Sequence, residues 1–258
     1  MGTRGIAART NPPYDPPDGS YDAEAADDRS ACVAPLAKGI AVSKKRVAIL
    51  ISGRGSNMEA LIAAAAQPSY PAQIALVISN RPEAPGLRRA VAAGIATEIV
   101  DHTLYGNDRE SFERALQAKL EAYRIDLVCL AGFMRLLSPS FVGKWHGRML
   151  NIHPALLPSF KGLDTHARAL AAGVKIHGAT VHMVVPEADS GPILAQAAVA
   201  VREGDTADTL AARVLDAEHR IYPAALKLLA EGRVRIVDQA CRIEGQIDAD
   251  GVLCVPKI

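Results

Sequence analysis

The stretch "RVAILISGRGSN", residues 46–57, decides the fold, because it leads from a strand through a glycine-containing loop into a helix. The segment after Arg46 is a continuous apolar run up to Ile51, which is typical of a strand buried on both faces. Met58, Leu61 and Ile62 then recur at helical spacing. A strand, loop and helix of this kind predict an α/β protein whose ligands bind at the carboxyl edge of a parallel sheet.

The same alternation of strand and helix continues along the chain. Apolar runs predict strands, and 3.6-residue periodicity predicts helices. The expected strands are residues 74–80, 96–100, 126–132 and 148–152, and the expected helices are residues 57–67, 86–94, 108–124 and 139–145. We therefore predict a Rossmann-like α/β fold with a mostly parallel, doubly wound sheet.

The later part of the chain predicts an antiparallel addition to that sheet. Residues 178–185 ("GATVHMVV") alternate in polarity, and residues 193–201 are expected to pair with them across the turn "PEADSGP", residues 186–192. A long helix is predicted for residues 206–230, followed by a hairpin within residues 241–255. No internal repeat or linker divides residues 45–258, which we expect to form one domain.

The composition excludes several classes of partner. Of the 258 residues, 49% are hydrophobic and 22% are charged, and the formal net charge is +1, so no strong field would attract nucleic acid or an anionic membrane. No apolar run reaches the roughly 18 to 20 residues of a membrane-spanning helix. The four cysteines lack the spacing of a zinc site, which argues against a metal and favours a reducing compartment. We expect a cytoplasmic protein with no nucleic-acid, membrane or metal partner.

The first 44 residues differ in character from the rest. They are rich in Pro, Asp, Gly and Ala and lack apolar periodicity, so we expect a disordered N-terminal extension. A targeting peptide is the competing interpretation, but the acidic residues between positions 22 and 28 fit neither a secretory signal nor a transit peptide. A start codon assigned too far upstream would give the same pattern.

The loop "SGRGSN", residues 52–57, is a candidate anion site. Gly53 and Gly55 allow close approach of the backbone, and the free N–H groups at the start of a helix attract a phosphate. Asn57 also suits an N-cap. The loop is neither a full dinucleotide fingerprint nor a P-loop, and a plain tight turn is the alternative. The expected ligand, if there is one, is a phosphate monoester.

The segment "NIHPALLP", residues 151–158, places two polar side chains on one face of a predicted strand. Residues at i and i+2 point the same way, so Asn151 and His153 share one space. A carboxamide can hydrogen-bond to an oxyanion and an imidazole can transfer protons near neutral pH, which are the two requirements of acyl transfer. Asp189, in the turn after the alternating strand, would orient the histidine. The alternative is a structural histidine and an ordinary turn aspartate.

The sequence contains no evident nucleophilic side chain. The GxSxG and HExxH motifs are absent, and Cys129 lies within a strongly apolar strand, where a structural thiol is expected. His177 and His182 are five residues apart on a predicted strand, which is not a metal-binding arrangement on one helix turn. The nucleophile is therefore expected to belong to a substrate.

Six blocks of sequence carry a family resemblance. In chain order they are "ILISGRGSN", "DLVCLAGFMRLLSP", "LNIHPALLPSFKG", "HGATVHMV", "EADSGPILAQ" and "EHRIYP". In order and spacing they resemble the phosphoribosylglycinamide formyltransferase family, from about Arg46 to about Gly232. The resemblance implies a formyltransferase fold for residues 45–258. It also implies transfer of a formyl group from 10-formyltetrahydrofolate, the cosubstrate, to the amine of glycinamide ribonucleotide in de novo purine biosynthesis, by direct attack without an acyl-enzyme.

The resemblance implies roles for individual residues. The catalytic group would be Asn151, His153 and Asp189. The ribonucleotide would be held by Gly55, Ser56, Asn57, Arg109 and Glu218, with the first three on its phosphate. The folate pocket would be lined by Met134, Arg135, Leu136, Leu137, Asn151, Pro186, Glu187, Ala188 and Asp189. Ser190 stands where many relatives carry a second glycine and Thr180 where a serine is common, but the catalytic set is intact.

Other functions within the superfamily remain open from the sequence. They are methionyl-tRNA formylation, which would need a basic RNA-binding domain of about a hundred residues, nucleotide-sugar formylation, and hydrolysis of formyltetrahydrofolate. A non-catalytic nucleotide-binding module is a further alternative, although simple binding does not require the set Asn151, His153 and Asp189. We expect a monomer or a homodimer that binds only small-molecule substrates.

Overall fold

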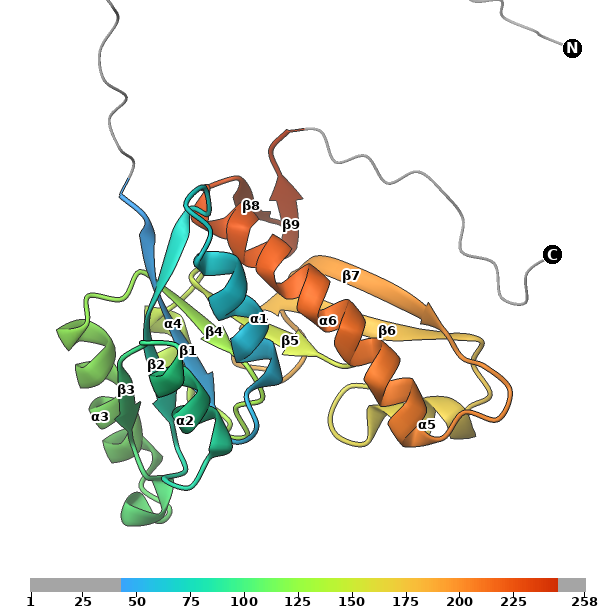
Figure 1. Cartoon of the computed structure of the whole chain (residues 1–258), viewed down its shortest axis with the longest axis horizontal. Helices are drawn as coiled ribbons and strands as arrows, with labels where there is room; N and C mark the ends of the chain where they lie inside the picture. The colour runs from blue at the N-terminus through green and yellow to red at the C-terminus, as the bar shows by residue number, and fades with distance from the viewer. Residues whose placement is uncertain (1–42, 246–258) are drawn as a thin grey trace, which may run out of the picture. The chain divides into compact units, whose positions relative to one another are not determined.

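A seven-stranded sheet forms the centre of residues 43–245, the part of the chain that the computed structural model describes (Figure 1). The strand order is β3-β2-β1-β4-β5-β6-β7, with parallel pairing from β3 to β5 and antiparallel pairing of β5 with β6 and of β6 with β7. The predicted fold class is thereby confirmed. The strands are β1 (Lys45–Ile51), β2 (Ala72–Ser79), β3 (Thr97–Ile99), β4 (Leu127–Leu130), β5 (Met149–His153), β6 (Ile176–Met183) and β7 (Ile193–Ala200).

Helices cover both faces of this sheet because successive residues of the strands point to opposite sides. Val47, Ile49 and Ile51 of β1 pack in a core with α1, α2 and α6, whereas Ala48 and Leu50 pack on the other face with α3 and α4. The helices are α1 (Ser56–Ala65), α2 (Pro85–Ala92), α3 (Arg109–Ala122), α4 (Pro139–Lys144), α5 (Thr165–Ala171) and α6 (Ala207–Ala230). Within residues 43–245, none of the helices combines the length and apolar character that a membrane span requires.

Three short elements differ from the predictions. The α5 helix and the 3₁₀ turn η1 (His102–Tyr105) were not predicted, because a few residues give no measurable periodicity. The hairpin of β8 (Val234–Val237) and β9 (Ala240–Ile243) lies upstream of most of residues 241–255. Its turn residues, Asp238 and Gln239, both adopt positive φ, as a two-residue hairpin turn requires, but they lack the glycine that marks such turns. Residues 1–42, which contain most of the expected extension, and residues 246–258 lie outside the described part.

Tyr222 of α6 ties two central strands together. Its side chain is fully buried, and its hydroxyl lies 2.9 Å from the Leu130 carbonyl of β4 and 3.2 Å from the Leu150 carbonyl of β5. One hydroxyl proton is thus shared between two carbonyl oxygens near the carboxyl ends of β4 and β5. Since buried polar groups need partners, this contact fixes α6 against the β4–β5 pair.

We expect Tyr222→Phe to lower the free energy of unfolding by about 1 to 3 kcal/mol, because it leaves buried carbonyl oxygens without their donor. Urea unfolding followed by circular dichroism measures this change. Tyr105→Phe is the control, since the Tyr105 hydroxyl makes no hydrogen bond within residues 43–245 and its removal should change stability by less than about 0.5 kcal/mol. Equal effects in the two variants would contradict the bridging role.

Candidate active site

A cavity of about 280 Å³ opens at the carboxyl edge of the sheet. Its lining residues are the loop Ser52–Asn57 after β1, Arg81 after β2, and Ala131, Gly132 and Met134 after β4. Strand β1 lies between β2 and β4, so the connections that follow β1 and β4 leave the sheet on opposite sides of this point. Such a switch point is where doubly wound sheets bind ligands. The cavity lies at the carboxyl edge of the sheet, where the sequence predicts that ligands bind.

The backbone of the loop after β1 suits an anion. Gly55 is in the left-handed region at φ 79° and caps α1, whose first N–H groups have no partner within the helix. The expectation that Asn57 is the N-cap was wrong, because Gly55, two residues earlier, is the N-cap and the helix begins at Ser56. Arg54 and Arg81, which the sequence analysis did not single out, also line the cavity and add positive charge. Their positions after β1 and β2 were the signal that could have found them.

Asn57 and Glu218 join the first and last helices of the sheet domain. The Asn57 Nδ2 donates to Glu218 Oε2 at 2.6 Å, across 161 residues of sequence. Glu218 is 6% exposed, and burial raises the pKa of its carboxyl while the Asn57 hydrogen bond opposes that rise. Two of the expected ribonucleotide contacts are therefore brought together. Arg109 is the first residue of α3 and is exposed, and within residues 43–245 no hydrogen bond or ion pair links it to this pair.

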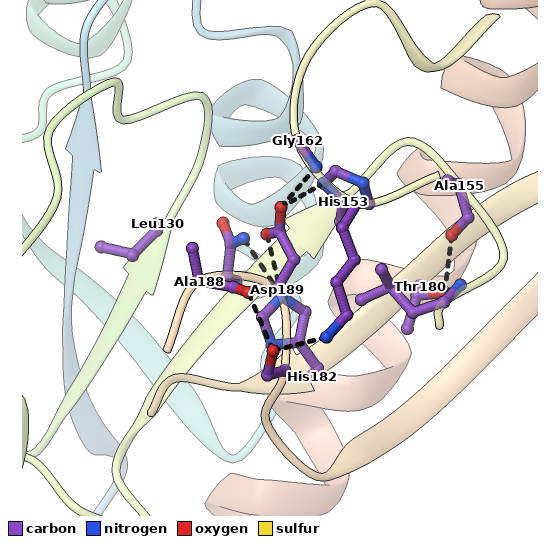
Figure 2. A network of polar contacts seen from close by, with 12 residues as sticks. Leu130, His153, Ala155, Gly162, Thr180, His182, Ala188 and Asp189 are labelled. Carbon is purple, nitrogen blue, oxygen red and sulfur yellow. Dashed lines mark hydrogen bonds and ion pairs between the residues drawn. The ribbon is translucent and has the colours of Figure 1, made fainter. Parts of the chain in front are cut away.

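The expected catalytic residues meet at the end of β5, as Figure 2 shows for His153 and Asp189. Asn151 and His153 lie on one face of β5, and the buried His153 ring places Nδ1 3.5 Å from Asp189 Oδ2. The other ring nitrogen, Nε2, lies 3.0 Å from the Phe160 carbonyl oxygen. Both nitrogens face oxygen atoms, so the imidazole is fully hydrogen-bonded only when both carry protons. Asp189 and the Phe160 carbonyl thereby fix the orientation of the ring beside the Asn151 amide.

His182 orients the Asn151 side chain, a role that the sequence analysis did not predict. The antiparallel register places His182 of β6 opposite Asn151, and Asn151 Nδ2 lies 3.2 Å from His182 Nε2. His182 Nδ1 lies 2.9 Å from the Met183 carbonyl and must donate to it, so Nε2 accepts from Asn151. Burial lowers the pKa of His182, which keeps it in this neutral form. The alternating polarity of residues 178–185 was the signal available for this contact.

The loop that carries Asp189 lies against the segment after β5. Asp189 adopts φ 50°, and its Oδ2 accepts from the Gly162 N–H at 3.0 Å. Lys161 Nζ donates to Ser190 Oγ at 2.6 Å and lies 3.8 Å from Glu187. At the end of this loop Gly191 has no space for a side chain, because a Cβ would lie 1.8 Å from the Met183 carbonyl oxygen. Pro186, Glu187 and Ala188 are exposed on the loop.

Successive side chains of residues 134–137, the expected folate segment after β4, are alternately exposed and packed on the core. Met134 lines the cavity and is 64% exposed, and Leu136 is also exposed, so both offer apolar surface. Arg135 lies over the Phe112 ring at 5.4 Å, and Leu137 packs on the same core. The Met134 N–H donates to Ser52 Oγ at 2.8 Å, which connects this segment to the anion loop.

A cluster of aromatic rings packs against the segment after β5 on the face of the sheet that α5 and α6 cover. His177 of β6 is 1% exposed, and its ring contacts Phe160 and His166 edge to face, with centroids 5.7 Å and 5.4 Å apart. Neither nitrogen of His177 has a partner of good hydrogen-bond geometry within residues 43–245, although the nearby Pro154 backbone acts to raise the pKa of the ring. Burial, and to a lesser extent His166 and His153, lowers the pKa of His177 from its ordinary value of 6.5 to about 4.

Comparisons with known proteins agree on one family. The formyl transferase family matches residues 45–226. The chain is 52% identical over 197 residues to the trifunctional purine biosynthetic protein adenosine-3 of Gallus gallus, covering 76% of this chain and 20% of that protein. It is 45% identical over 203 residues to phosphoribosylglycinamide formyltransferase of Escherichia coli, covering 78% of this chain and 94% of that protein.

A solved structure extends the likeness to the fold. The crystal structure of phosphoribosylglycinamide formyltransferase from Brucella melitensis has a TM-score of 0.70 at 56% identity, covering 73% of this chain and 96% of that one. The chain therefore spans about a fifth of the length of the Gallus gallus relative, and most of the length of the Escherichia coli and Brucella melitensis proteins.

The buried His177 predicts a loss of stability in acid. The unfolded chain takes up a proton at this position below about pH 6.5, and the folded chain does so only near pH 4, so stability falls as pH decreases between these values. At pH 5 we expect this histidine to account for at most about 2 kcal/mol of the decrease. Urea unfolding of wild type and His177→Phe at pH 7 and pH 5 tests this expectation. Equal decreases in the free energy of unfolding in the two proteins would contradict it. His146→Gln, which removes an exposed imidazole, is the control and should lose stability in acid as wild type does.

Proposed function

The chain belongs to the formyl transferase family, and on this premise we propose that it transfers the formyl group of 10-formyltetrahydrofolate to the amine of glycinamide ribonucleotide. The activity and substrates of the whole protein are part of this proposal. The observation that carries it is the polar group at the end of β5, where a carboxamide, an imidazole and a carboxylate converge beside an anion-binding cavity. A phosphorylated amine and a formyl donor are the substrates for which these two adjoining sites are suited.

The ribonucleotide phosphate is assigned to the start of α1. Gly55, Ser56 and Asn57 offer backbone N–H groups there, with Arg54 and Arg81 at the same cavity. Glu218, held by Asn57, is assigned to the glycinamide end of the substrate. Arg109 remains a proposed contact at the exposed start of α3.

The folate is assigned to the surface between two segments. Met134, Arg135, Leu136 and Leu137 form one side, and the loop with Pro186, Glu187, Ala188 and Asp189 forms the other. Exposed Met134 and Leu136 give the apolar area on which an aromatic pterin ring can pack. Asn151, which pairs with Leu130 of β4 and His182 of β6, is assigned to the same ligand. Both substrates are small molecules, and a cytoplasmic location and a monomer or homodimer remain predictions from the sequence.

The chemistry requires no side-chain nucleophile. The substrate amine attacks the formyl carbon and forms a C–N bond, giving a tetrahedral oxyanion that Asn151 Nδ2 and protonated His153 stabilise. The bond from that carbon to folate N10 then breaks, and tetrahydrofolate leaves. Asp189 stabilises the charged imidazole and assists the transfer of one proton from the attacking nitrogen to N10. Formyl group and proton are thereby exchanged between the two nitrogens.

A steady-state assay separates this function from its alternatives. The release of deformylated folate from 10-formyltetrahydrofolate is measured with and without glycinamide ribonucleotide. The proposal expects turnover that depends on the ribonucleotide. Equal turnover without it would make water the acceptor and favour formyltetrahydrofolate hydrolysis. No turnover in either case would favour a binding module or another acceptor, such as a nucleotide sugar or a charged tRNA.

We expect Asn151→Ala and Asp189→Ala each to lower kcat by at least about 10² to 10³, since each removes a group that stabilises the oxyanion or the charged imidazole. Both side chains lie at the site and not in the main apolar cores, so circular dichroism and melting temperature should remain close to wild type. Glu110→Ala, an exposed carboxylate on α3, is the control for general surface changes. Near-normal turnover in both site variants would refute the assignment.

A further inference from the structure

We propose that Phe160 and His177 are positioning residues for the reaction, and that their ring-to-ring contact holds His153 and Asp189 in place from the opposite side of the sheet. The inference rests on the proposed formyl transfer for its kinetic consequences. Its geometric basis does not depend on that function, because it concerns contacts within the free protein.

One tripeptide bonds to both members of the catalytic pair. The Phe160 carbonyl lies 3.0 Å from His153 Nε2. The Gly162 N–H donates to Asp189 Oδ2 at 3.0 Å, as Figure 2 shows. The same Asp189 oxygen lies 3.5 Å from His153 Nδ1. The backbone of residues 160–162 therefore sets the position of His153 and Asp189 together. Any displacement of this segment moves both.

The Phe160 side chain anchors that tripeptide. Its ring belongs to the apolar cluster of Ala169, Ala179, Leu210 and Val214, between α5, α6 and β6, although its carbonyl reaches the other face of β5. Phe160 adopts φ 56°, a left-handed conformation that aromatic residues rarely adopt, so the local backbone does not favour this position by itself. The Arg168 guanidinium lies 5.7 Å from the ring centroid and donates to the Lys161 carbonyl at 2.6 Å. Packing of the ring therefore maintains the segment.

His177 contributes through its ring and not through its nitrogens. It is buried, contacts Phe160 edge to face at 5.7 Å, and is itself packed by His166. The Pro154 carbonyl nearby already accepts from Thr165 Oγ1 at 2.7 Å. Because neither His177 nitrogen has a partner of good hydrogen-bond geometry within residues 43–245, a phenylalanine would retain the ring contact and lose at most a weak interaction with the Pro154 carbonyl. An alanine would remove the contact.

Two measurements test the proposal in the full-length protein. The first is kcat and KM for the ribonucleotide in Phe160→Ala, Phe160→Tyr, His177→Ala and His177→Phe. The second is the solvent exchange rate of the His153 ring proton on Nε2, followed by ¹⁵N-resolved NMR of the free protein. Asn151→Ala is the control for this rate, because it leaves the contact between His153 Nε2 and the Phe160 carbonyl intact. Leu170→Ala is the matched control, because Leu170 packs on the same cluster but does not belong to residues 160–162.

We expect Phe160→Ala and His177→Ala to lower kcat by at least about tenfold with KM within about threefold, because misplaced catalytic groups affect turnover more than binding. The ring proton should exchange at least about tenfold faster in both, whereas Phe160→Tyr and His177→Phe should match wild type in both measurements. Leu170→Ala should keep both values even where it lowers stability.

Three results would overturn the proposal. They are wild-type kcat and proton exchange in Phe160→Ala, equal losses in Leu170→Ala, or a His177→Phe variant as impaired as His177→Ala. If wild type shows no ribonucleotide-dependent turnover, the proposed function fails, and the proton exchange rates in the free protein still decide whether Phe160 and His177 hold His153.

Discussion

The mixed pairing of β5 is the constraint on which the site depends. Parallel pairing with β4 places the end of β5 at the same edge as the loop after β1, so the anion cavity and the polar group adjoin. Antiparallel pairing with β6 places His182 opposite Asn151 and Thr180 opposite His153. Thr180 Oγ1 in turn donates to the Ala155 carbonyl and accepts from the Leu157 N–H, which fixes the start of the following segment. Strand β5 thus joins the parallel strands that carry the cavity to the antiparallel strand β6, which orients the side chains of Asn151 and His153.

The groups that face the ring nitrogens divide the buried histidines of this region into two kinds. His177 and His182 are enclosed and their pKa values are lowered chiefly by desolvation, so they remain neutral near pH 7. His153 is equally buried, but a carboxylate and a carbonyl face its two nitrogens. The three buried rings therefore differ in the polar groups that face their nitrogens. The neutral rings of His177 and His182 supply packing and orientation to the segments around His153 and Asn151.

Local patterns sufficed for the sheet and for the faces of its strands, but not for contacts between distant segments. The run before the loop at Gly55 predicted β1 and α1, and the i, i+2 spacing of Asn151 and His153 placed both on one face. Which residue lies opposite Asn151 depends on the register of β6, and that register is set by a connection that includes the unpredicted α5. The N-cap of α1 was misassigned by two residues because the left-handed turn at Gly55 outweighs the capping propensity of Asn57. Short helices and side chains that act across the sheet require the tertiary structure.

The bond between Asn57 and Glu218 has a consequence for synthesis of the chain. The two residues are separated by 161 positions, so the Asn57 side chain gains this partner only after α6 has been made. Because domains emerge from the ribosome in order, the parallel strands can associate while α6 is still being translated. The loop after β1 then exists before Glu218 is present to accept the Asn57 hydrogen bond. The hydrogen bond that holds the Asn57 side chain therefore forms later than the sheet on which α1 packs.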